Sequence, residues 1–393
     1  MNITLSIKRF LQSQKARVVL GLIGLYLLVV GVSWAAFSYL KTGPKEIISP
    51  TGISEKRAAI DLSAPKTEAC PLTGEKFTSA ERDIWSKRRP LTVMIENHEE
   101  SRPQSGLSNA DIVYEAIAEG GITRFLAIFY CGTSAAEVQI GPVRSARTYY
   151  LDWASEYGDF PLYAHVGGAN KPGLTDALGQ IRKYGWDSYN DLNQFSIGFP
   201  TFWRDYERLG HPVATEHTMY STTDKLWEVA EERELGAKNK DGKSWDENFV
   251  PWNFSDGKSA TSPTATRITF PFWEGMGAYE VAWNYDSGVN VYKRDNGGNP
   301  QQDLNNNEQL QATNVVVIFT RARGPVNELK HMLYDTTGSG KALIFQNGEV
   351  IEATWSKASR TARTKFMSGG REVSFVRGPI WIEVLDTQTK VEY

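Results

Sequence analysis

The stretch ADIVYEAIAEGGITRFLAIFY, residues 110–130, decides how this chain folds. Two runs of β-branched, aliphatic and aromatic residues flank a double glycine, which is a strong signal for a tight β-hairpin. Segments with helix and strand patterns alternate on either side of it, and this alternation favours an α/β arrangement. Charged residues stand inside both runs, so the same hairpin also bears on function.

A two-residue turn at the double glycine determines which side chains share a face of the hairpin. Glu119 then faces Ile122, and Ile117 faces Arg124. We therefore expect Glu115, Glu119 and Arg124 on one face, among large apolar residues. Charges in such company are unusual for a solvated face, so this face is expected to line a cleft or to lie under a second layer.

Two glutamates on one face raise the possibility of acid–base catalysis on glycans. Retaining glycosidases need carboxyl groups about 5 Å apart and inverting ones roughly 6.5–9.5 Å. Residues four apart on a strand lie about 13 Å apart along the backbone. Strand geometry therefore argues against Glu115 and Glu119 as a catalytic pair; a helix would fit that spacing, but the double glycine and the Val, Ile and Tyr content favour strands.

A second charged segment, IGPVRSARTYY at residues 140–150, places two arginines in the expected first turn of a helix. Helix N-termini carry partial positive charge, so arginines there imply a negative group nearby. In one reading, Arg144 and Arg147 pair with the hairpin glutamates or Asp152 and hold helix to sheet. In the other, they form an anion site with Ser145 and the helix start, for a phosphate or carboxylate.

Two histidines follow predicted strands. His165 ends the strand in FPLYAHVGG, just before Gly167, Gly168 and a helix, and ligands usually bind at such an edge of an α/β sheet. A hydrogen-bonded structural role is the alternative for His165. His98 follows the strand PLTVMIEN in the same kind of position. Both histidines, with the two glycines, are ligand-binding candidates, and His165 is also an acid–base candidate beside Glu115 and Glu119.

The remaining chemical motifs exclude more than they indicate. His217 is a further ligand candidate, but His211 and His217 in HPVATEHTMY show no recognised metal spacing. Neither a G-x-S-x-G elbow nor a P-loop occurs, and Cys131 at the end of a buried strand is a poor nucleophile. We therefore expect no metal site and no cofactor.

The N-terminus predicts a membrane anchor. Residues 18–40 contain no charge, and as a helix they would rise about 35 Å and cross a bilayer core of about 30 Å. Four basic residues precede this run and the first acidic residue follows it, so residues 1–17 are expected in the cytoplasm and the rest outside. The alternative is a cleaved signal peptide, but the run is long and lacks a small-x-small cleavage site.

Composition divides the rest of the 393-residue chain, whose net charge of −3 and lack of basic blocks argue against nucleic-acid binding. Residues 41–89 are rich in Pro, Ser, Thr, Lys and Glu and predict an extracytoplasmic tether. Residues 90–236 predict an α/β or α+β domain with a mixed sheet. The polar residues 237–264 read as a linker, and residues 265–393 predict a mainly β domain.

The two cysteines, Cys70 and Cys131, both lie on the expected outer side, where disulfides are permitted. Closing a loop of about 60 residues would contribute on the order of 4 kcal/mol in the chain-entropy model. Because Cys131 ends an apolar strand, a free buried thiol is the alternative.

A family resemblance becomes specific over two blocks. RPLTVMIENHEESRPQSGLSNADIVYEAIAEGGITRFLAIF, then IGPVRSARTYYLDWASEY and YAHVGG, resembles the amino-terminal half of the YerB-like family, a domain of unknown function. NVVVIFT, GSGKALIFQNGEVIEATWSK and GPIWIEVL resemble its smaller carboxy-terminal domain. The resemblance implies a bacterial surface lipoprotein and no established reaction. This chain has no cysteine between its apolar segment and Cys70, so a transmembrane anchor is expected to replace the lipid.

The residues that match the family coincide with the charged segments described above. They include Glu115, Glu119, Gly120, Gly121, Arg124, Gly141, Pro142, Arg144, Ser145, Arg147, His165 and Gly167. EHTMYS stands where the family more often has a Pro-His-Asn type of sequence, so His217 matches and its neighbours do not.

Three hypotheses remain for the function. The first is a membrane-anchored extracytoplasmic module that binds an anionic envelope component, such as a wall glycan, a peptide stem or a polymer phosphate. The second is a hydrolase or transferase of the same polymers, with Glu115 or Glu119 as general acid or base and the arginines holding the substrate. The third is a structural partner of the cell-wall synthesis machinery.

Overall fold

The computed structural model describes residues 18, 22, 24–32 and 60–393. The chain forms two compact units, Met1–Ile53 and Ser54–Tyr393, and the second unit contains the fold discussed below. Residues 24–32 are helical, and no helix among the described residues is long and apolar enough to cross a membrane. The predicted span 18–40 lies largely outside the described residues, as do the cytoplasmic segment and the first part of the tether.

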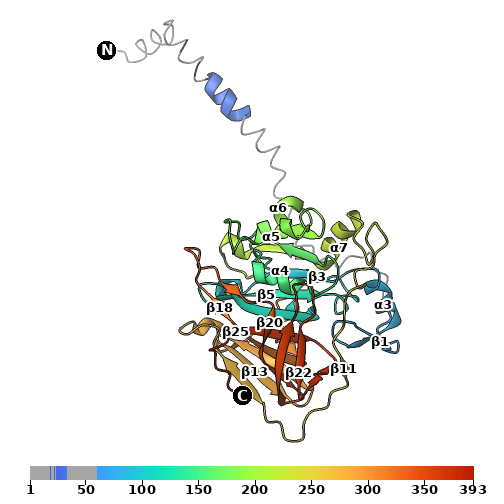
Figure 1. Ribbon diagram of the computed structural model, residues 1–393. Helices are drawn as coiled ribbons and strands as arrows, with labels where there is room; N and C mark the ends of the chain where they lie inside the picture. Colours follow the sequence, from blue (N-terminus) through green and yellow to red (C-terminus); the bar gives the residue numbers. More distant parts are fainter. Residues whose placement is uncertain (1–17, 19–21, 23, 33–59) are drawn as a thin grey trace. The chain divides into compact units, whose positions relative to one another are not determined.

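An eleven-stranded mixed sheet runs through the second unit (Figure 1). Across the sheet the strands are β23 (Arg371–Glu372), β22 (Lys365–Ser368), β21 (Glu349–Lys357), β20 (Gly338–Gln346), β17 (Asn314–Thr320), β25 (Ile380–Asp386), β4 (Ile112–Glu119), β5 (Ile122–Phe129), β3 (Leu91–Glu96), β7 (Leu162–His165) and β8 (Asp191–Asn193). β25 pairs in parallel with both β17 and β4. The last long strand therefore joins the two halves of the chain into one sheet, and the fold is mixed α/β and mainly β.

The middle of this sheet is covered on both faces, and Figure 1 shows α4 and β13 on opposite sides of β5. One cover is a smaller antiparallel sheet of β12 (Arg267–Phe270), β13 (Val281–Asp286), β14 (Val291–Asn296), β15 (Asn299–Pro300) and β16 (Gln311–Ala312). On that face Trp283 packs edge-on against Trp381 of β25, with ring centroids 5.3 Å apart. The other cover is helix α4 (Thr148–Ala154), whose Trp153 stacks on Tyr114 of β4 at 5.5 Å.

The remaining elements are short. The helices are α3 (Ser79–Trp85), α5 (Ala177–Lys183), α6 (Gln194–Ile197), α7 (Thr223–Glu232), η1 (Glu99–Ser101), η2 (Leu107–Asn109), η3 (Thr215–His217) and η4 (Gly277–Tyr279). The other strands are β1 (Glu68–Ala69), β2 (Lys76–Phe77), β6 (Gln139–Ile140), β9 (Trp203–Arg204), β10 (Met219–Thr222), β11 (Phe254–Ser255), β18 (Ala322–Arg323), β19 (Leu333–Tyr334) and β24 (Phe375–Val376). Thr222 caps α7 by accepting a hydrogen bond from the backbone N–H of Lys225.

The end of the stretch expected to be a tether is folded. Trp85 of α3 is buried, and Cys70 is joined to Cys131 by a disulfide with the two Cα atoms 6.0 Å apart. α3 also carries a complete capping box between Thr78 and Glu81. Elements of two and seven residues carry too little periodicity to be seen in a polar sequence, which is why the expectation and the structure differ here.

The predicted β4–β5 hairpin is present, but its register is not the expected one. Both glycines of the turn have positive φ, which glycine adopts without strain. Beyond the turn the pairing shifts by one residue, because Ala118 is the extra residue of a β-bulge. Arg124 therefore pairs with Ala116 and not with Ile117.

This bulge separates the three charges that were predicted to share a face. A shift of one residue moves a side chain to the opposite face of a sheet. Glu115 lies on the face covered by the smaller sheet, whereas Glu119 and Arg124 lie on the face of α4. The prediction of one shared face is thus wrong, and the hairpin contributes to two separate charged clusters.

The predicted start of the helix after the hairpin is also wrong. α4 begins at Thr148, so Arg144 and Ser145 lie before its first turn. Residues 140–146 are held by backbone hydrogen bonds to neighbouring segments, as when Arg144 N–H donates to the Met94 carbonyl at 2.8 Å. These long-range bonds fix an extended backbone where the local sequence pattern favours a helix.

Candidate functional site

The face of α4 carries a group of five charges, here called the arginine cluster: Glu96, Glu119, Arg124, Arg144 and Arg147. The Glu119 carboxylate lies between two guanidinium groups, 2.8 Å from Nη2 of Arg124 and 2.7 Å from Nη2 of Arg147. Arg144 places its Nε against Oε2 of Glu96. Three guanidinium groups thus meet two carboxylates, which leaves one positive charge in excess.

Two of the three arginines are engaged inside the protein. Arg124 is fully buried and also donates from Nη1 to the Ser145 carbonyl at 2.9 Å. Arg147 is buried as well; it donates from Nε to Glu119 at 3.2 Å and from Nη1 to the Ala146 carbonyl at 2.7 Å. Both side chains join the hairpin to the segment before α4.

Arg144 differs from its neighbours in exposure and in hydrogen bonding. Its side chain is 24% exposed, and within residues 60–393 its one side-chain contact is the Nε contact with Glu96. The two terminal amino groups of its guanidinium therefore have no protein partner among the described residues. Arg144 is the member of the cluster that offers free N–H donors at the surface.

The pKa values of the two carboxylates keep the cluster charged. Burial alone would raise the pKa of Glu96, but the neighbouring His217 ring and the charges of Arg124 and Arg144 lower it to about 2. Burial likewise opposes ionisation of Glu119, and the charges of Arg124 and Arg147 lower its pKa to about 2. Both glutamates are ionised at neutral pH, so the excess of one positive charge persists.

Two of the predicted ligand-binding histidines lie beside this cluster. His98 precedes η1, His217 ends η3, and their rings stack with centroids 4.8 Å apart and planes inclined by 17°. Nδ1 of His217 lies 3.6 Å from Oε2 of Glu96, and its Nε2 lies 3.8 Å from Oε2 of Glu100. The fold thus brings together two histidines that are far apart in the chain.

The other residues predicted to bind ligands at the end of β7 have structural contacts in this region. His165 is fully buried, with Nδ1 2.6 Å from the Gly167 carbonyl and Nε2 2.5 Å from Oδ1 of Asp191. Both ring nitrogens are thus engaged within the protein. Gly168 forms a β-bridge with Ala146, next to Arg147. These residues hold the segment that carries the arginines.

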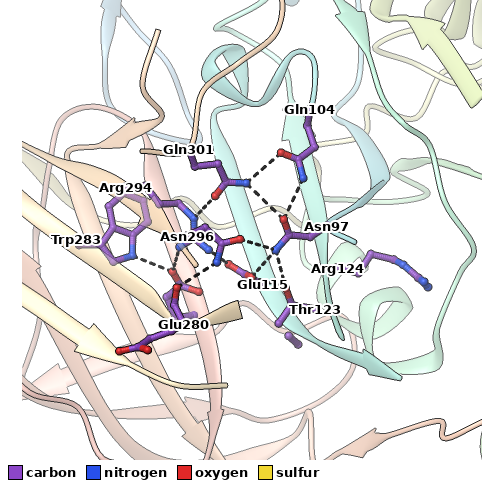
Figure 2. A network of polar contacts seen from close by, with 12 residues as sticks. Asn97, Gln104, Glu115, Thr123, Arg124, Glu280, Trp283, Arg294, Asn296 and Gln301 are labelled. Carbon is purple, nitrogen blue, oxygen red and sulfur yellow. Dashed lines mark hydrogen bonds and ion pairs between the residues drawn. The ribbon is translucent and has the colours of Figure 1, made fainter. Parts of the chain in front are cut away.

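Glu115 belongs to a different group, here called the closed cluster: Glu115, Arg294 and Glu383. Arg294 lies between the two carboxylates, with Nη2 2.5 Å from Glu115 and Nη1 2.8 Å from Glu383. All three side chains are fully buried. Figure 2 shows Arg124 pointing away from this network, which agrees with its place on the opposite face of the hairpin.

Polar side chains complete the closed cluster (Figure 2). Thr123 donates to Glu115 at 2.6 Å, Trp283 donates to Glu383 at 2.9 Å, and Gln301 accepts from Nε of Arg294 at 2.6 Å. Burial raises the pKa of Glu383 well above its ordinary range, against the charge of Arg294 and with that of Glu115. The closed cluster thus holds two carboxyl groups against one guanidinium group, and burial favours the protonated form of Glu383.

The sequence reading missed Glu96, Arg294 and Glu383. Glu96 ends the strand before His98, so the strand-end argument that selected His98 could also have selected it. Arg294 and Glu383 lie on strands of the second half of the chain, where a charge within a strand is ordinarily solvated. Nothing in the local pattern indicates that these two meet Glu115.

Comparisons with known proteins agree with this architecture. Residues 72–236 match the family described as "Protein of unknown function (DUF3048) N-terminal domain", and residues 268–382 match its C-terminal domain. A Bacillus subtilis (strain 168) protein named "Putative lipoprotein YerB" is 31% identical over 340 residues, 84% of this chain and 90% of the relative. The crystal structure of YerB protein from Bacillus subtilis is similar with a TM-score of 0.66 at 26% identity, covering 83% of this chain and all of that one.

Proposed function

Because the chain belongs to the DUF3048 family, we propose that it is an extracytoplasmic protein, anchored in the membrane, that binds an anionic component of the cell envelope through Arg144. The relative is named "Putative lipoprotein YerB", and this name supports a membrane-attached role. In this chain the uncharged run 18–40 supplies the anchor, since no cysteine occurs between it and Cys70.

The observation that carries the binding proposal is the open guanidinium fork of Arg144. Glu96 is buried and ionised, and it holds Arg144 by Nε alone. The two terminal amino groups have no partner within residues 60–393, and the Arg144 side chain is 24% exposed. A planar fork of this kind matches the paired oxygens of a carboxylate or a phosphate.

The charge balance supports the same proposal. The arginine cluster contains one more guanidinium group than carboxylates. An incoming anion would neutralise that excess, and Arg144 is the only member of the cluster whose two terminal amino groups both lack a partner within the described chain. Envelope polymers offer such anions as polyol phosphates, peptide-stem carboxylates and acidic glycans.

An enzyme that uses Glu115 or Glu119 as its general acid has less support. Glu115 is fully buried and bound to Arg294. Glu119 has a pKa of about 2, whereas an efficient general acid at neutral pH needs a pKa near that pH. His165, the other catalytic candidate, has both ring nitrogens engaged within the protein.

The proposal is tested by measuring how the purified full-length chain binds two probes, a polyol-phosphate wall polymer and soluble peptidoglycan fragments. Arg144→Gln should weaken binding of the recognised probe by about 10- to 100-fold, the usual worth of a charge-assisted hydrogen-bonded contact. Arg371→Gln is the matched control, because Arg371 is exposed on β23 at one edge of the sheet.

The fold of each variant would be checked by circular dichroism and its thermal midpoint. Unchanged binding of both probes by a folded Arg144→Gln protein would contradict the proposal. An equal loss in Arg371→Gln would reduce the interaction to non-specific attraction of polyanions.

A further inference from the structure

Beside the arginine cluster, three metal-ligating side chains converge that the anion-binding proposal does not use. One ligand atom from each of His98, Glu100 and His217 lies within 4.8 Å of the other two. Two imidazole nitrogens and one carboxylate oxygen are a ligand set typical of zinc, and three protein ligands leave one position open on a tetrahedral ion.

The ring of His217 lies beside the carboxylate of Glu96, which favours an orientation suited to binding a metal. Its side chain is 5% exposed, and its buried Nδ1 has no hydrogen-bond partner within 3.5 Å among the described residues. That atom faces a carboxylate oxygen of Glu96 at 3.6 Å, while Nε2 lies 3.8 Å from a carboxylate oxygen of Glu100. A carboxylate behind one ring nitrogen favours the tautomer whose other nitrogen has a free lone pair, as in carboxylate–histidine–zinc arrangements.

From this geometry we propose that His98, Glu100 and His217 form a binding site for a divalent transition metal of the zinc class. Ligands of one tetrahedral zinc lie roughly 3.3–3.5 Å apart, so the three side chains must approach one another by about 1 Å. The ring of His98 must also turn, because it is stacked nearly parallel to that of His217 and imidazole lone pairs lie in the ring plane. Glu100 is 61% exposed and His98 is half-buried, so both have room to move toward the fixed ring of His217.

The metal site and the anion site use different ligands. A metal held by Nε2 of His217 lies across the imidazole ring from Glu96, and it is Glu96 that Arg144 contacts. Loss of the Arg144 guanidinium therefore removes no metal ligand. A variant can therefore lose one of the two binding activities and keep the other.

The test is a titration of the purified, chelator-treated full-length chain with Co²⁺, followed by displacement with Zn²⁺. The wild-type chain should bind about one Co²⁺ with visible d–d absorption, and Zn²⁺ should remove that signal. His98→Ala should weaken binding on the order of 100-fold, and so should His217→Ala. His98→Ala is the safer variant, because His98 is half-buried, whereas His217 is buried.

His211→Ala is the matched control, because His211 is an exposed histidine whose Nδ1 lies 3.2 Å from the neighbouring Pro212 carbonyl. This variant should retain the wild-type Co²⁺ affinity. The proposal is overturned if the wild-type chain gives no saturable Co²⁺ spectrum, or if folded His98→Ala binds as tightly as wild type.

Discussion

The closed cluster and the arginine cluster are built from the same residue types on opposite faces of one hairpin, and they differ in what they leave exposed. In the closed cluster one arginine lies between Glu115 and Glu383, and every side chain is buried. In the arginine cluster Glu119 is 25% exposed and Arg144 keeps free donors within the described chain. The two clusters thus differ in whether a donor remains unpaired at the surface, and only the arginine cluster has one within the described chain.

The largest expected effect follows from removing the cation of the closed cluster. Arg294→Met leaves the buried carboxyl groups of Glu115 and Glu383 without their cation, and should lower the free energy of unfolding by about 3–5 kcal/mol. Urea denaturation at pH 7 measures this change, with exposed Arg371→Met as the control. A loss below about 1 kcal/mol would mean that the closed cluster contributes little to stability.

A smaller effect concerns the pH dependence of the arginine cluster. The folded pKa of about 2 for Glu96 and Glu119 lies below their ordinary value of 4.5, so their stabilisation is complete above pH 4.5 and is lost as pH falls toward 2. The loss of free energy of unfolding should be on the order of 2 kcal/mol per carboxylate. Solvent partly screens Glu119, which reduces its share.

Comparing urea denaturation of wild type and Glu119→Gln between pH 5 and 2 isolates the contribution of Glu119. The wild-type free energy of unfolding should fall more steeply across this range than that of the variant. Parallel curves would show that the two arginines do not lower the pKa of Glu119.

The smallest effect is expected at Glu383 of the closed cluster. Burial raises the pKa of Glu383 and so opposes its charged form, and Glu383→Gln supplies a neutral side chain that can still accept from Arg294 and Trp283. The free energy of unfolding at pH 7 should change by less than about 1 kcal/mol. A loss as large as that of Arg294→Met would show instead that Glu383 is ionised in the folded protein.

Several elements were predictable because their signals are local. The double glycine and the Asn347-Gly348 turn each give a hairpin, and β7 ends at His165 as the sequence predicts. The family resemblance, carried by long stretches of sequence, is confirmed. In each case a few neighbouring residues suffice for the inference.

The remaining features depend on residues that are distant in the chain. No residue of AIAEGG distinguishes a regular strand from one with a bulge at Ala118, yet that one residue assigns Glu115 and Glu119 to different clusters. The extended backbone at Arg144 is fixed by hydrogen bonds to β3 and to residues 166–167. Arg294 is brought to Glu115 only by the packing of the smaller sheet.

We propose that the Arg144 guanidinium binds an anion, whereas the buried Arg294 guanidinium does not. The most direct measurement is a titration of the full-length chain, labelled with ¹⁵N in its arginine side chains, with inorganic phosphate. We expect the Arg144 guanidinium signals to shift in a saturable way and the Arg294 signals to stay unchanged. The Arg144 signals are assigned by their absence from the spectrum of Arg144→Gln. Arg144 signals that stay in place, or that move no more than those of exposed Arg371, would contradict the proposal.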